Sequence, residues 1–169
     1  GLSRQTAFFA PAYHCVTMID PALAIGAEVR LFRLNDDLSP DLAHITELLA
    51  TINSPVKALL ATHYFGVIQD FRSLKKFCRA QGIVLIVDCS HVLFTENFQA
   101  AGSGECGDLM IASPYKFFCC ADGGLLYAPE ADWLAQVVTH KSSLIDELLG
   151  IKNTYQRSRS GSAGGFEID

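Results

Sequence analysis

Short apolar runs that alternate with longer amphipathic stretches constrain the fold of this 169-residue chain more than any other feature. The runs are rich in Val, Ile, Leu and Phe and have the length of buried strands. They cover residues 7–10, 29–33, 58–61, 84–87, 108–112 and 124–127. Strands that alternate with helices in this way predict an α/β fold, with a mostly parallel sheet flanked by helices.

Helical spacing fills the gaps between the first four runs. Helices are predicted over residues 17–25, 41–51 and 71–81, and each meets a stop signal, at Gly26, the Asn53-Ser54-Pro55 turn and Gly82 respectively. Ser39 followed by Pro40 predicts the start of the second helix, with the serine as its cap. A last helix is expected over residues 131–149, broken around 139–143.

The length and composition predict one main domain, residues 1–151, followed by a flexible polar tail at 152–169. A net charge of -5 and the lack of a sustained basic face argue against nucleic acid as a partner. No segment approaches the roughly 18 apolar residues that span a bilayer. The six cysteines have neither zinc-site spacing nor the density of a secreted disulfide scaffold. We therefore expect a soluble cytoplasmic protein with free thiols and no metal.

Lys116 lies in an apolar run, residues 111–120, where a lysine is costly to bury. A buried ammonium group loses hydration, so its pKa tends to fall toward the range in which the free amine is a nucleophile. Such a lysine is a Schiff-base candidate, and Asp88, at the end of another apolar run, supplies an acidic neighbour. This pairing suggests pyridoxal 5'-phosphate. The alternative is that Lys116 reaches from a strand end into solvent.

Reactive side chains also follow the other apolar runs. His14 follows the first run, His63 the third, Asp88 and His91 the fourth, and Lys116 the fifth. Ligands of open α/β sheets gather beyond the carboxyl ends of the strands, so these five side chains are expected to share one rim. Each histidine alone could equally be a hydrogen-bonded structural residue.

The chemistry of pyridoxal phosphate suggests a role for each residue. A lysine holds the cofactor aldehyde and later moves a proton, which fits Lys116. A carboxylate opposite the pyridine nitrogen keeps it protonated, which fits Asp88. His91 could bond the ring hydroxyl or orient Asp88, and His14 is the first candidate to stack on the ring. Ser113 could bond the phosphate or orient Lys116, although a serine at a turn caps backbone donors at least as often.

The order and spacing of several motifs resemble one enzyme family. The motifs are Pro11-Ala12-Tyr13-His14-Cys15, Ala27-Glu28, Asp37-Leu38-Ser39-Pro40-Asp41, Thr62-His63-Tyr64-Phe65-Gly66, Asp88-Cys89-Ser90-His91, Gly107-Asp108, Lys116 and Gly123-Gly124. Over roughly residues 7 to 128 the chain resembles the DegT/DnrJ/StrS aminotransferases, fold type I pyridoxal-phosphate enzymes of which many act on nucleotide-linked keto sugars. The resemblance implies that Lys116 is the aldimine lysine, Asp88 the partner of the pyridine nitrogen and His91 the residue near the ring hydroxyl. It also implies a homodimer.

The chain departs from the family pattern in three respects. Many members have the phosphate-binding serine five residues before the lysine, where this chain has Ile111, and Ser113 stands three before it. At the stacking position, commonly aromatic, the nearest matches are His14 and Cys15. Family members are also more than twice as long, with flanking segments that cradle the phosphate and shape the substrate site. We therefore expect this chain to be the central part of a larger enzyme.

Three functional hypotheses follow. The first is an aminotransferase that moves an amino group from an amino-acid donor, such as glutamate, to a keto sugar or similar carbonyl. The second is a fold type I lyase such as a cysteine desulfurase, suggested by Cys119 and Cys120 close to Lys116. The third is a catalytically silent domain with an interaction role, which fits the length. The sequence leaves open whether this chain is an active enzyme by itself.

Overall fold

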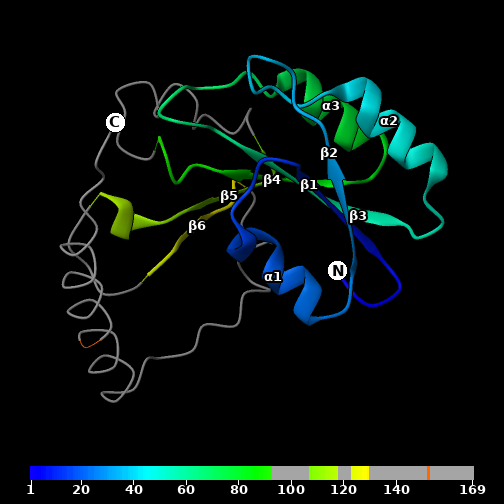
Figure 1. Cartoon of the computed structure of the whole chain (residues 1–169), viewed down its shortest axis with the longest axis horizontal. Coiled ribbons are helices and arrows are strands. Elements are labelled where there is room, and N and C mark those ends of the chain that lie inside the picture. The colour runs from blue at the N-terminus through cyan, green and yellow to red at the C-terminus, as the bar shows by residue number, and fades with distance from the viewer. Residues whose placement is uncertain (93–106, 118–122, 130–151, 153–169) are drawn as a thin grey trace, which may run out of the picture.

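The computed structural model describes residues 1–92, 107–117, 123–129 and 152 (Figure 1). Within them, six strands form one sheet in the order β2-β1-β3-β4-β5-β6. The strands are β1 (Ala7–Pro11), β2 (Glu28–Phe32), β3 (Val56–Thr62), β4 (Val84–Asp88), β5 (Leu109–Ala112) and β6 (Leu125–Tyr127). The first five pair in parallel and β6 pairs antiparallel to β5. The predicted α/β fold is confirmed, and each predicted strand lies within two residues of the observed one.

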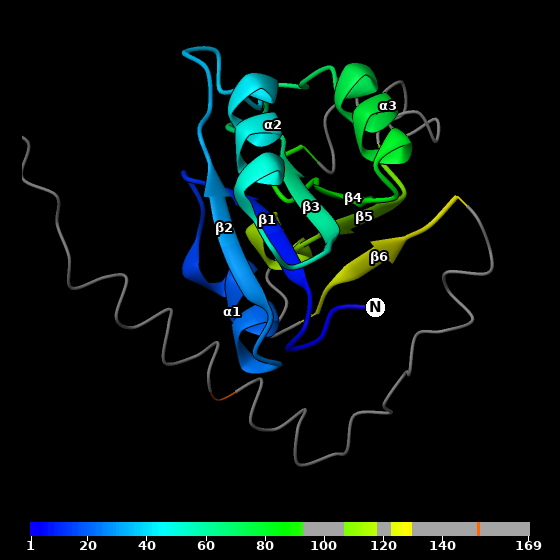
Figure 2. The ribbon, with the colours of Figure 1, turned by 90° about the vertical axis from the view of Figure 1, so that its right-hand side faces the viewer.

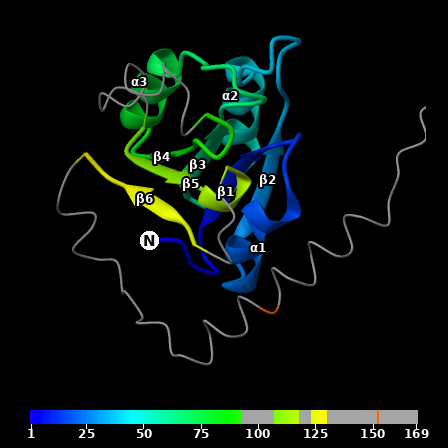
Figure 3. The ribbon, with the colours of Figure 1, turned by 90° about the vertical axis from the view of Figure 1, so that its left-hand side faces the viewer.

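Three helices cover the two faces of the sheet. They are α1 (Val16–Ala24), α2 (Leu42–Thr51) and α3 (Arg72–Ala80), which confirms the three helices predicted between the strands. Figures 2 and 3 show α1 on one face and α2 with α3 on the other. Alternate side chains of β1 explain this arrangement, because successive strand residues point to opposite faces. Phe9 packs in one core cluster with Ile45 and Leu74. Phe8 packs in the other with Ala22.

Two of the predicted stop signals end their helices by the same geometry. Gly26 and Gly82, which follow α1 and α3, have positive φ values of 78° and 67°. The Gly26 amide donates to Leu23 O at 2.9 Å and the Gly82 amide to Arg79 O at 3.3 Å. Glycine adopts this left-handed conformation without steric cost, so the chain can turn back and satisfy carbonyls of the last helical turn.

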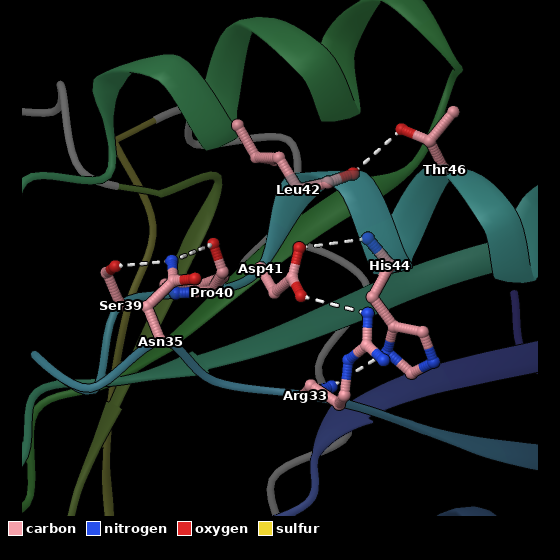
Figure 4. A network of polar contacts seen from close by, with 8 residues as sticks. All are labelled: Arg33, Asn35, Ser39, Pro40, Asp41, Leu42, His44 and Thr46. Atoms are coloured by element: carbon pink, nitrogen blue, oxygen red, sulfur yellow. Dashed lines mark hydrogen bonds and ion pairs between the residues drawn. The ribbon is translucent and has the colours of Figure 1, made fainter.

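The start of α2 differs from the prediction, because Asp41 and not Ser39 caps the helix (Figure 4). Asp41 Oδ1 accepts a hydrogen bond from the His44 amide at 3.0 Å. The Ser39 hydroxyl instead donates to Asp37 Oδ1 at 2.6 Å within the preceding turn. Arg33, which follows β2, also holds the helix start. Its guanidinium forms an ion pair of 3.3 Å with Asp41 Oδ2, and its backbone amide donates a hydrogen bond to His44 Nδ1 at 2.9 Å.

Some predictions fall outside the described residues. These are the helix over 131–149, the pair Cys119 and Cys120, and nearly all of the tail at 152–169. The domain boundary at residue 151 therefore stays a prediction. Among the helices that the structure describes, none is both long and apolar enough to cross a membrane.

The connections change direction between β1 and β3. The crossover through α1 leads from β1 to its neighbour β2, whereas the crossovers through α2 and α3 lead back across the sheet to β3 and β4. Crossovers of one hand that run in opposite directions place their helices on opposite faces, as observed. Ligands of such sheets bind beyond the carboxyl ends of the strands, near the point of reversal. The candidate site lies at this edge.

Candidate active site

Two polar side chains at the ends of β3 and β4 keep unused hydrogen-bonding capacity. Asp88 is 6% exposed, and its Oδ1 accepts a hydrogen bond from the Ser90 amide at 2.8 Å. Its Oδ2 accepts none from the residues that the structure describes. Thr62, the register partner of Asp88 on β3, has a buried hydroxyl oxygen that makes no well-formed hydrogen bond within the described part of the chain, although it lies close enough to the Tyr64 hydroxyl to lower the pKa of that phenol. Buried polar groups are normally paired, so this pair favours a polar ligand at the edge.

The His91 side chain beyond β4 has a defined tautomer. The Phe65 amide donates to His91 Nδ1 at 3.2 Å, so Nδ1 is an acceptor and the proton of the neutral ring lies on Nε2. Burial lowers the pKa of His91, the positive charge of Lys116 lowers it further, and the carboxylate of Asp88 opposes both effects. At neutral pH His91 therefore offers Nε2–H as a hydrogen-bond donor.

Lys116 is exposed, so of the two alternatives the lysine that reaches beyond a strand end into solvent is the one observed. The reason is that β5 ends at Ala112, and the following 3-10 turn η1 (Pro114–Lys116) takes the lysine beyond the sheet. Its charge still lowers the pKa of both His91 and Cys15. The ammonium group therefore acts at the ends of both β1 and β4, on the edge where Asp88 lies.

Ser113 occupies the residue before η1, yet its hydroxyl does not cap this turn. The structure shows no hydrogen bond between the Ser113 hydroxyl and any described residue, and the side chain is partly exposed. The capping alternative considered for this serine is thus wrong. Its hydroxyl remains available to a ligand or to Lys116.

His14 and Cys15, the two matches to the stacking position, both follow β1. His14 Nδ1 donates to Pro11 O at 2.8 Å, because a carbonyl can only accept, and this bond ties the ring to the strand end. The exposed Cys15 thiol lies 3.2 Å from Thr17 Oγ1. That hydrogen bond is the largest cause of the lowered pKa of Cys15. Both residues lie at the predicted edge, while stacking on a ring stays a prediction.

His63 does not belong to the rim, contrary to prediction. Its ring is 1% exposed and stacks on Phe71 with centroids 4.7 Å apart. Its Nδ1 accepts a hydrogen bond from the Gln69 amide at 3.0 Å. Burial lowers the pKa of His63 to about 4. The physical reason is the alternation along β3, which turns His63 to the face covered by α3 and Thr62 to the opposite face.

Three aromatic residues at the edge were not assigned a role from the sequence. Tyr13 follows β1, and Tyr64 and Phe65 follow β3. The Tyr64 hydroxyl donates to Tyr13 O at 2.6 Å, and burial raises the pKa of Tyr64 to about 12. Tyr13 and Phe65 are 57% and 65% exposed. The available signal was the position of these residues beyond β1 and β3, the two strands that flank the topological reversal.

A family model matches residues 1–158 of this chain, and its description is the DegT/DnrJ/EryC1/StrS aminotransferase family. The chain belongs to this family. DegT/DnrJ/EryC1/StrS aminotransferases depend on pyridoxal phosphate. Membership confirms the resemblance inferred from the motifs.

Curated and solved relatives agree with this assignment. The chain is 24% identical over 158 residues to GDP-perosamine synthase of Vibrio cholerae, a match that covers 90% of the chain and 38% of that protein. It is thus much shorter than this relative.

Among solved structures, aminotransferase TlmJ from Streptoalloteichus hindustanus aligns with a TM-score of 0.65 at 21% identity, over 80% of this chain and 37% of that one. PseC of Helicobacter pylori, an aminotransferase involved in the biosynthesis of pseudoaminic acid, aligns with a TM-score of 0.66 at 17% identity, over 92% of this chain and 47% of that one. These similarities establish the fold as that of fold type I aminotransferases.

The described side chains fit the family's cofactor. Asp88 Oδ2 and the Thr62 hydroxyl, neither of which makes a well-formed hydrogen bond to the residues that the structure describes, provide polar groups at the strand ends. His91 provides a donor at Nε2 and Lys116 an exposed amine. Among the residues that the structure describes, no group of three His, Cys, Asp or Glu side chains is arranged to hold a metal ion.

Proposed function

We propose that this chain carries the cofactor-binding edge of a pyridoxal-phosphate-dependent aminotransferase. The amino group would pass from an amino-acid donor to a keto sugar or a similar carbonyl. The observation that carries the proposal is the buried Asp88 carboxylate, whose Oδ2 accepts no hydrogen bond from the described residues, next to a His91 ring on which both Asp88 and Lys116 act electrostatically. When bound, the cofactor supplies an electron sink for the substrate carbon that loses its proton.

Asp88 would pair with the pyridine nitrogen and hold a proton there. A carboxylate at that position favours the protonated ring nitrogen by charge pairing. The Ser90 amide holds Oδ1 in place at 2.8 Å and leaves Oδ2 for this contact. A mutation to asparagine would keep the shape and remove the charge.

Lys116 and His91 would bind the reacting side of the cofactor. Lys116 Nζ would bind the aldehyde carbon and, when the amino donor replaces it, take up and return a proton at Nζ. His91 Nε2–H would donate a hydrogen bond to the ring hydroxyl oxygen. Its lowered pKa keeps the imidazole neutral, so that it orients the ring without adding a second positive charge beside Lys116.

Ser113 and His14 would complete the set of binding residues. The hydroxyl of Ser113, which does not cap η1 and bonds no described residue, is proposed to bond the phosphate or to orient Lys116. His14, tied to Pro11 O, is proposed to cover one face of the ring. Both assignments follow from position at the carboxyl ends of β5 and β1.

The proposal extends to the substrate class, the assembly and the location. A sugar acceptor is supported by the similarity to GDP-perosamine synthase. We propose a cytoplasmic location with no nucleic-acid partner, as the charge and cysteine usage suggest, and a homodimer, as the resemblance to the family implies.

The test is a spectrum of the purified chain with pyridoxal phosphate, followed by borohydride reduction and mass spectrometry of the peptides. We expect a visible absorption band and a pyridoxyl group on Lys116. Lys116→Ala should lose both. Lys76→Ala, at an exposed lysine of α3, should keep both. Equal spectra for the wild type and Lys116→Ala would refute the assignment of Lys116.

Addition of glutamate then separates an active enzyme from a silent domain. In an active enzyme, the first half-reaction should convert the bound cofactor to its amine form and shift the visible absorption band. A loaded protein whose band does not change with any of several amino-acid donors would favour the catalytically silent alternative. Asp88→Asn should slow the conversion without abolishing binding of the cofactor.

A further inference from the structure

Phe65 makes two separate contacts with the His91 imidazole. Its backbone amide donates a hydrogen bond to His91 Nδ1 at 3.2 Å. Its ring stacks on the imidazole, with centroids 6.0 Å apart and an interplanar angle of 23°. Phe65, which follows β3, therefore constrains both the Nδ1 atom and the ring plane of His91, which follows β4.

The backbone of Phe65 is in a conformation that few residues with large side chains adopt. Its φ is 53°, in the left-handed region, and Gly66 follows with a φ of 84°. A bulky residue in this region is an outlier that the surrounding structure must hold in place. Packing in the core does not explain it, because Phe65 is 65% exposed.

Two further aromatic rings also contact Phe65. The Tyr13 and Tyr64 rings each lie 6.1 Å from the Phe65 ring between centroids. The Tyr64 hydroxyl donates to Tyr13 O, which joins the ends of β1 and β3. The aromatic cluster therefore connects His91 to the rigid ends of two central strands.

An imidazole at this position has two charged neighbours with opposite effects. Lys116 disfavours the protonated ring and Asp88 favours it. Without a fixed hydrogen bond, either ring nitrogen could carry the single proton. The Phe65 amide that donates to Nδ1 fixes the tautomer, because a neutral ring that accepts at Nδ1 must hold its proton at Nε2.

We propose that Phe65 is a positioning residue that holds the neutral His91 ring in its Nε2–H tautomer and in one orientation. The consequence for binding rests on the proposed function, in which Nε2–H faces the ring hydroxyl of pyridoxal phosphate. The positioning itself is a property of the cofactor-free chain. It can be measured there.

The first experiment uses nitrogen NMR of the cofactor-free chain labelled at histidine. His91→Asn identifies the signals of His91. The wild type should show a protonated Nε2 and an unprotonated Nδ1. Phe65→Pro, which removes the amide proton, should raise the population of the Nδ1–H form. Phe65→Asn keeps the amide and tolerates the left-handed backbone but removes the ring, and it should raise the pKa of His91 by exposing the imidazole to water.

Phe65→Tyr is the matched control, because it keeps both the amide and the aromatic ring, and its His91 signals should equal those of the wild type. The proposal is overturned if Phe65→Asn leaves the pKa of His91 unchanged. It is also overturned if folded Phe65→Pro keeps the wild-type tautomer. Proline cannot adopt the φ of 53° at this position. Should Phe65→Pro fail to fold for this reason, the Phe65→Asn titration tests the role of the ring, and a protonated Nδ1 in the wild-type spectrum would overturn the role of the amide.

A second experiment measures the affinity for pyridoxal phosphate. Phe65→Asn and His91→Asn should each weaken binding by about threefold to tenfold, the effect of one neutral hydrogen bond. The double variant should bind no more weakly than His91→Asn, since both changes remove the same contact. Additive losses would contradict the positioning role. If the wild type binds no cofactor, the proposed function fails while the NMR result still tests the positioning.

Discussion

Three histidines follow strands at the same edge of the sheet, and each has a different environment. His63 is buried against Phe71 and is held by the Gln69 amide. His91 is partly buried beneath Phe65, and His14 is tied to its own strand end. At the scale of the single residue, burial and hydrogen bonding decide which of them can meet a ligand.

Burial of His63 should make the stability of the chain depend on pH. Its folded-state pKa of about 4 lies below the ordinary value of 6.5. Between these values the unfolded chain binds a proton that the folded chain rejects. The contribution of neutral His63 to the free energy of unfolding is therefore complete above pH 6.5. It is lost as the pH falls toward 4, and the total loss is at most roughly 3 kcal/mol. Urea denaturation at several pH values measures this change.

His63→Asn is the control for this prediction. Its side-chain oxygen can still accept the Gln69 amide, but it does not titrate in this range. The pH dependence of the variant should be shallower than that of the wild type. Identical slopes for the two proteins between pH 4 and pH 7 would contradict the assignment, because all other titrating groups are common to both.

At the scale of the element, Gly107 and Asp108 fix the start of β5 against β4. The Asp108 amide donates to Leu85 O at 2.9 Å, and the Leu85 amide donates to Asp108 Oδ2 at 2.8 Å. A Cβ atom on Gly107 would lie 2.8 Å from Val87 Cγ2. The close approach of Gly107 and the two hydrogen bonds of Asp108 fit the register in which Asp88 lies beside Ile111, and η1 with Lys116 follows from this register.

Gly107→Ala should therefore destabilise the chain by about 1 to 3 kcal/mol, the usual effect of overpacking a tight contact. Chemical denaturation monitored by circular dichroism measures the loss. Gly124→Ala is the matched control, since its Cβ would meet only Ala112 O, at 3.9 Å. It should change the stability by less than about 0.5 kcal/mol. Equal effects at the two positions would contradict the role given to Gly107.

At the scale of the whole molecule, helices cover both faces of the sheet and β6 forms one of its edges. Three consecutive apolar residues of β6, Leu125, Leu126 and Tyr127, are 49%, 40% and 51% exposed. An exposed apolar edge strand is a site where a second chain can pair. This edge is the physical basis, within the described residues, for the homodimer that we propose.

Analytical ultracentrifugation should give a mass twice that of the chain. Leu126→Lys should shift the equilibrium toward the monomer, because a charge on the edge opposes pairing of strands. Leu31→Lys is an equally drastic change at an exposed position of β2, the opposite edge strand. It should leave the equilibrium between monomer and dimer unchanged. A monomeric wild type at all concentrations, or equal effects of the two variants, would contradict this prediction.

The sequence by itself determined the kinds of element, their approximate bounds and the placement of Asp88 and His91 after the same strand. These are local properties, because the spacing of apolar residues and the turns at Gly26 and Gly82 each depend on only a few neighbouring residues. The carboxyl ends of parallel strands share an edge, so a correct strand assignment was enough to place Asp88 and His91 at the edge where the candidate site is proposed.

Only the tertiary structure decided which side chains at that edge are accessible and how they are paired. It buries His63, exposes Lys116 beyond the end of β5, and joins Phe65 to His91 across 26 residues of sequence. Exposure and hydrogen-bond partners depend on groups distant in the chain, whose approach is fixed by sheet order and register. For this reason no local pattern could predict them.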